Sequence, residues 1–128
     1  GEDGILGRSL ENFSSGLVAL KNTLGAAEWR RTCVVAMTEF GRTVRENGTQ
    51  GTDHGHGGLA LIAGGAVRGG RMLGGFDGLA DRSLNESRDL PVHVDWRDLL
   101  GSAMVETCGF GAPALDRVFP GRPGRTWI

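Results

Sequence analysis

The chain has 128 residues and a formal net charge of −1, from 14 Lys and Arg against 15 Asp and Glu. It therefore fits one domain with a real core, and its balanced charge gives no reason to expect nucleic acid or an anionic membrane as partner. No apolar run approaches the ~20 residues of a membrane span, so we expect none.

The first predicted element is a helix with one apolar stripe. The stripe residues recur at three- and four-residue spacing and are Leu10, Phe13, Leu17, Leu20 and Leu24. Gly25 follows the last of them and is expected to close the helix. Two short apolar runs, residues 32–37 and 59–63, predict strands buried on both faces, and residues 71–73 are expected to form a short third strand.

A second helix is predicted to begin near Asp95, which can cap it, and to end before Gly109. Its expected buried stripe is Trp96, Leu99, Leu100, Ala103 and Met104. Residues 113–118 predict a short helical turn, and residues 122–128 predict a frayed tail.

Helices that alternate with buried strands favour the α/β class, with a parallel or mixed sheet. Two or three strands are few for such a sheet, because buried parallel strands need neighbours on both sides and helices on both faces. We therefore expect one domain over residues 1–128 that is the C-terminal piece of a larger unit. Its uncovered apolar surface predicts association, with a missing N-terminal portion or with itself.

The candidate chemistry begins where the first strand ends. Glu39 follows that strand directly, and in open α/β sheets ligands bind beyond the carboxyl ends of strands. Arg42 and Arg45 offer planar guanidinium groups that suit phosphate or sulfate. The alternative is that Glu39 and Arg42 form a structural ion pair within the turn.

A second candidate group lies in the glycine-rich stretch that contains Asp53, His54 and His56. Carboxylate and neutral imidazole are suitable ligands for zinc, manganese or iron, and glycine lets the backbone fold closely around an ion. The alternative is an ordinary polar turn, since Asp, His and Gly are common loop residues. His93 is interpreted as a partly buried histidine rather than a ligand.

The order of motifs along the chain resembles the bacterial family called domain of unknown function 1501. The matching segments are TCVVAMTEFGRT at 32–43, RENG at 45–48, GTDHG at 51–55, GGAVRGG at 64–70 and VFPG at 118–121. That family is similar to the alkaline phosphatase superfamily, which includes sulfatases. The resemblance implies the C-terminal portion of an α/β/α sandwich, and a protein exported to the periplasm by the twin-arginine route.

The resemblance also implies a metal site. Where the superfamily has an Asp-His pair at a strand end, this chain has Glu39 and Phe40, so Glu39 can replace the Asp but Phe40 cannot replace the His. His54 matches another metal-binding His and is the best single ligand. Asp53 and His56 follow it as secondary ligands or as groups that support the ligands. The superfamily's nucleophile lies earlier in the sequence, outside this chain.

Two functional classes follow. The first is part of a metal-dependent hydrolase of phosphate or sulfate esters, with zinc or manganese as the expected ion and Arg42 as the catalytic cation. The second is a catalytically inactive derivative that binds a ligand or a partner protein. The first class implies a small anionic ester as substrate.

Overall fold

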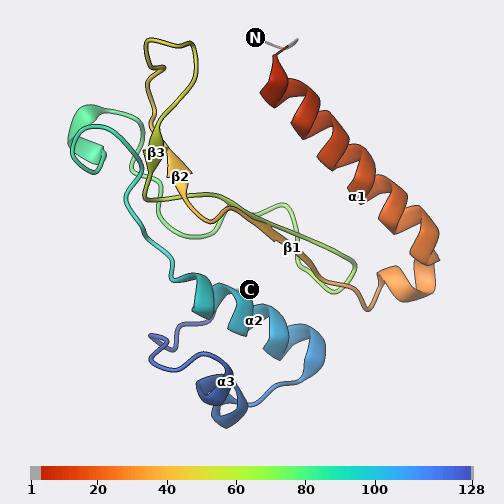
Figure 1. Cartoon of the computed structure of the whole chain (residues 1–128). Helices are drawn as coiled ribbons and strands as arrows, with labels where there is room; N and C mark the ends of the chain where they lie inside the picture. The colour runs from red at the N-terminus through yellow and green to blue at the C-terminus, as the bar shows by residue number, and fades with distance from the viewer. Residues whose placement is uncertain (1–3, 128) are drawn as a thin grey trace.

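The computed structural model describes residues 4–127. Four short strands form an antiparallel ribbon, with the long N-terminal helix standing on one side of it and the two C-terminal helices lying together on another (Figure 1). In chain order the elements are α1 (Ile5–Trp29), β1 (Val34–Met37), β2 (Gly41–Arg42), β3 (His54–Gly55), β4 (Ala60–Ala63), the 3₁₀ turn η1 (Asp81–Ser83), α2 (Trp96–Cys108) and α3 (Ala112–Val118). This mixture of helices and strands is compatible with the expected α/β class.

Helix α1 is longer than its apolar stripe predicts. Gly25 interrupts the helical dihedral angles with a φ of 70°, as its closing role requires, but the chain resumes helical turns as far as Trp29. No residue of α1 is buried, and Phe13 in the middle of the stripe is 41% exposed. None of the helices among residues 4–127 is both long and apolar enough to cross a bilayer. Figure 1 shows α1 standing apart from the other elements, and its apolar stripe is largely exposed, with Leu17 and Leu24 half-buried.

The strands form one long hairpin, which corrects the expectation of a parallel or mixed sheet. Strand β1 pairs antiparallel with β4 from Val34 opposite Ala63 to Met37 opposite Ala60, and β2 pairs antiparallel with β3. The chain between β2 and β3 returns directly without a crossover helix, and such a return produces antiparallel neighbours. Residues 71–73, the expected third strand, have no regular secondary structure.

Helix α2 has the ends that its sequence predicts. The Asp95 side chain accepts a hydrogen bond from the backbone N–H of Arg97, and Gly109 adopts the left-handed conformation with φ 69°. Within residues 4–127, the buried apolar side chains are Leu84, Leu99, Ala103 and Leu115. The predicted stripe is therefore only partly buried, since Trp96 is 51% exposed and packs its ring edge-on against Phe119.

The C-terminal tail is held against α2, in contrast to the frayed tail expected from sequence. Asp98 is 1% exposed, and its carboxylate accepts hydrogen bonds from the backbone N–H groups of Gly124 at 2.9 Å and Arg125 at 3.0 Å. Ser102, one turn further along α2, accepts a bond from the N–H of Trp127 at 2.9 Å. These side chains on α2 supply the backbone partners that an isolated tail would lack.

We predict that Asp98→Ala releases the tail and lowers the free energy of unfolding by about 1–3 kcal/mol, because the N–H groups of Gly124 and Arg125 lose their charged acceptor. Amide hydrogen exchange at Gly124 and Arg125 should accelerate in the variant. Asp116→Ala is the matched control, because Asp116 is exposed and pairs with the Arg122 side chain at 3.2 Å. Unchanged exchange in Asp98→Ala would contradict this account of the tail.

Candidate functional site

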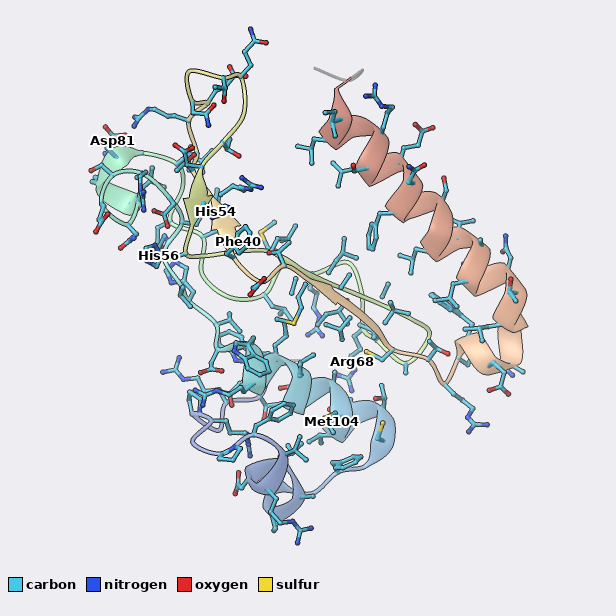
Figure 2. All side chains as sticks on the ribbon, viewed as in Figure 1. Phe40, His54, His56, Arg68, Asp81 and Met104 are labelled. Carbon is cyan, nitrogen blue, oxygen red and sulfur yellow. The ribbon has the colours of Figure 1, made fainter. Side chains whose placement is uncertain are left out.

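The polar residues singled out in the sequence lie around the β2–β3 pair, which we call the ribbon end and define as residues 40–42 and 54–57. Figure 2 shows Phe40, His54 and His56 in this region, well away from Arg68 and Met104. Because residues 40–42 and 54–57 belong to the two arms of one hairpin, strand pairing brings them together.

Arg42 and His54 are direct cross-strand partners in the β2–β3 register. Side chains of directly opposed residues leave the same face of an antiparallel pair. The Phe40 ring lies against the His54 imidazole with centroids 4.2 Å apart, and the Arg42 guanidinium lies 5.7 Å from the Phe40 ring centroid. Arg42 also donates to the carbonyl of Thr52 at 2.7 Å, which fixes its position.

A buried carboxylate lies behind this face. Asp89 is fully buried, and its Oδ2 accepts a hydrogen bond from the backbone N–H of His56 at 2.6 Å. The same Oδ2 lies 3.0 Å from Nδ1 of the His56 ring, and Nδ2 of Asn85 lies 3.0 Å from that nitrogen. Oδ1 of Asp89 makes no hydrogen bond and faces Nε of Arg88 at 3.3 Å.

The charge state of Asp89 follows from these contacts. The backbone N–H of His56 is the largest influence and lowers the pKa of the carboxyl below its ordinary value of 3.8. Burial acts in the opposite direction, whereas the His56 ring and the Asn85 amide lower the pKa further. Asp89 is therefore ionised at neutral pH.

Glycines allow the segment around Asp89 to approach the ribbon. A Cβ at Gly55 would lie 2.6 Å from the Cβ of Asp89, and one at Gly57 would lie 2.5 Å from the carbonyl oxygen of Pro91. The N–H of Gly57 donates to the carbonyl of Leu90 at 2.8 Å, which ties the segment to the hairpin. Gly55 and Gly57 therefore provide the space that these contacts need.

The other predicted site residues are placed as follows. Glu39 is exposed in the bend between β1 and β2, and Arg42 donates to Thr52 rather than pairing with it. Asp53 accepts a hydrogen bond at 2.9 Å from the Asn47 side chain. Arg45 forms an ion pair with Asp81 in η1.

His93 lies outside this cluster. Its side chain is 33% exposed, and its Nε2 lies 3.4 Å from a carboxylate oxygen of Asp77. This placement matches a partly buried histidine with a carboxylate neighbour.

The fit of these residues to a metal ion can be judged from their arrangement. Throughout residues 4–127, no group of three or more His, Cys, Asp or Glu side chains is placed to hold an ion. Asp53, His54 and His56 each face a different neighbour, namely Asn47, Phe40 and Asp89. A stable zinc site needs three or four protein ligands, so these residues do not form one by themselves.

Sequence reasoning did not select Asp89 or Asn85. Both lie in a polar, turn-rich stretch, 33 and 29 residues from their partner His56. A charged residue between Arg88 and the apolar Leu90-Pro91-Val92 run was the only local signal for a buried carboxylate. This signal does not indicate that His56 is the partner of Asp89.

Comparison with known proteins gives the family of this fold and site. The model of a family described as protein of unknown function (DUF1501) matches residues 3–110. Since the match covers most of the chain, the chain belongs to this family. No curated protein and no solved structure matches it.

The lowered pKa of Asp89 predicts how stability depends on pH. A carboxyl whose pKa is lower in the folded than in the unfolded state stabilises the fold above its ordinary value of 3.8. This contribution is lost as the pH falls through the lowered, folded-state pKa. We expect Asp89→Asn to be less stable than the parent at neutral pH, and the difference to shrink as the pH falls below 3.8.

Thermal unfolding followed by circular dichroism across this pH range would test the prediction. Asp95 retains an acid-dependent slope in both proteins, because its bond to the Arg97 side chain also lowers its pKa. A stability difference between parent and Asp89→Asn that does not change with pH would show that the Asp89 charge has no such role.

Proposed function

We propose that this chain forms the C-terminal part of an alkaline-phosphatase-like hydrolase of phosphate or sulfate esters, with an α/β/α sandwich completed by residues outside it. The observation that carries the proposal is the cross-strand pairing of Arg42 with His54. It brings a guanidinium and an imidazole to one face of the ribbon end, where an anionic ester would meet both.

The chemistry of this face suits an ester that gains negative charge during reaction. The bond from Arg42 to Thr52 holds the guanidinium in place and leaves its other N–H groups for an oxyanion. A fixed cation stabilises charge that develops in the transition state without having to reorganise first. His54 supplies a second nitrogen next to it, and the Phe40 ring limits how that imidazole can turn.

The expected metal is a separate part of the proposal. Zinc or manganese would need ligands from outside residues 4–127 in addition to His54, because this part of the chain brings no three ligands together. Export to the periplasm likewise rests on the family resemblance alone.

Inorganic phosphate is the probe that tests the proposed anion site. We expect it to bind at the ribbon end and to shift the NMR signals of His54, with binding lost in Arg42→Ala. Arg68→Ala is the matched control, because Arg68 is an exposed arginine away from the ribbon end (Figure 2). Phosphate binding that is indifferent to Arg42 would contradict the proposal.

Measurement of ester hydrolysis provides a second test of the proposed function. The 128-residue chain alone should not hydrolyse an aryl phosphate or aryl sulfate, since no nucleophile is placed by motif in it. In a longer protein that carries this chain and turns over such esters, Arg42→Ala should lower kcat by about 10²–10³-fold.

A second candidate function is supported by a different observation. The Phe40 ring covers one face of His54 at 4.2 Å, and α1 leaves its apolar stripe exposed. Both features suit a catalytically inactive family member that binds a partner protein, because contiguous exposed apolar surface marks interaction sites.

This second candidate predicts association through α1. Sedimentation velocity should show self-association of the chain, or a complex with a longer N-terminal portion, and Phe13→Ser should weaken it. Ser15→Ala, on the opposite side of the helix, is the control that should change nothing. A monomer with cooperative unfolding would exclude association through this stripe.

A further inference from the structure

We propose that Asp89 is a positioning residue that holds His56 with its proton on Nδ1, so that Nε2 is a fixed acceptor for a hydroxyl group at the ribbon end. The identity of the hydroxyl, on a water or on a phosphate group, rests on the proposed function. The orientation of the ring does not depend on the proposed function.

The contacts of Asp89 determine the tautomer. Its Oδ2 accepts from the His56 backbone N–H at 2.6 Å and lies 3.0 Å from Nδ1 of the same residue. An ionised carboxylate can only accept hydrogen bonds, so Nδ1 must be the donor. The neutral ring then has no hydrogen on Nε2.

Asn85 is the one neighbour that could favour the opposite tautomer. Its Nδ2 lies 3.0 Å from Nδ1, and an amide N–H would need a lone pair there. However, a hydrogen bond to a full carboxylate is roughly twice as strong as one between neutral groups, so the Asp89 bond prevails. The Asn85 amide can instead serve Asp89, where its hydrogen bond helps to lower the carboxyl pKa.

The two side chains of the Asp89–His56 pair differ in burial, since the carboxylate lies inside the protein and the ring lies at its surface. Asp89 is fully buried, whereas 59% of the His56 side chain is exposed. The Arg88 guanidinium, 3.3 Å from Oδ1, compensates charge on the oxygen that makes no hydrogen bond. Burial therefore holds the Asp89 carboxylate in place, and Nε2 of the His56 ring stays accessible.

The backbone of the ribbon is adapted to this arrangement. Asp89 comes so close to Gly55 that an added Cβ would lie 2.6 Å from its own Cβ. Real Cβ atoms essentially never approach so closely, so any larger residue at position 55 would push the carboxylate away from His56. Gly55 is accordingly required for the Asp89–His56 contact.

A carboxylate bonded to one nitrogen of an imidazole is a recurring means of fixing the tautomer and orientation of the ring. At the ribbon end this gives His56 a defined acceptor, two residues along the chain from His54.

Imidazole ¹⁵N NMR on the complete chain at mildly alkaline pH tests the inference, since it distinguishes protonated from bare ring nitrogens. We expect His56 to show a protonated Nδ1 and a bare Nε2. His93 is the internal control and should show the opposite tautomer, because its Nε2 faces Asp77. A wild-type His56 with hydrogen on Nε2 would overturn the proposal, whatever any variant does.

Substitutions then test whether the Asp89 contact is the cause of this His56 tautomer. Asp89→Asn should raise the population of His56 that carries hydrogen on Nε2, and Gly55→Ala should act in the same direction, with His93 unchanged in both. A His56 tautomer that ignores Asp89→Asn would overturn the positioning role. Phosphate binding that is independent of Arg42 would instead refute the proposed anion site and leave the ring orientation standing, so the two failures are distinguishable.

Discussion

The segment around Asp89 reaches the hairpin because the ribbon carries glycine at each point of contact. A Cβ at Gly41 would lie 1.9 Å from the carbonyl oxygen of Gly57, so even the two arms of the ribbon meet there backbone to backbone. Gly55 likewise comes close to the Cβ of Asp89, and Gly57 to the backbone carbonyl groups of Leu90 and Pro91. The arrangement at the ribbon end requires glycine at these positions. A side chain there would occupy the space in which the Asp89 carboxylate lies beneath the His56 backbone.

Two buried carboxylates connect segments that lie far apart in the sequence. Asp89 ties the polar stretch to the hairpin 33 residues earlier, and Asp98 ties α2 to the tail 26 and 27 residues later. In each case backbone N–H groups are the main partners and a nearby arginine balances the charge. Burying a charge without such partners would be strongly unfavourable, so these contacts specify which segments meet.

The parts of the fold that were predicted correctly are those set by local chemistry. Asp95 and Gly109 define the ends of α2 through contacts within a few residues, and the apolar spacing before Gly25 is sufficient to predict α1. Strand direction was not predictable, because a short apolar run such as residues 34–37 fits parallel and antiparallel partners equally well. Among the candidate residues, Arg42 and His54 are brought together by the pairing of strands that are close in sequence, whereas Asp89 reaches His56 only through a tertiary contact that no local pattern indicates. Asp98 illustrates the same limit, since its carboxylate binds tail residues 26 and 27 positions later.

The closure of the tail on α2 also bears on how the chain reaches its fold. All its anchoring contacts join residues within the last third of the sequence, from Asp98 to Trp127. The ribbon pairs Val34 with Ala63 over a similar separation, and Asp89 joins His56 over 33 residues. Because loop-closure entropy grows slowly with loop length, these three sets of contacts have nearly equal entropic cost. The tail contacts share no residue with the ribbon, so the closure of the tail on α2 does not require the ribbon end, where the candidate chemistry lies, to be formed.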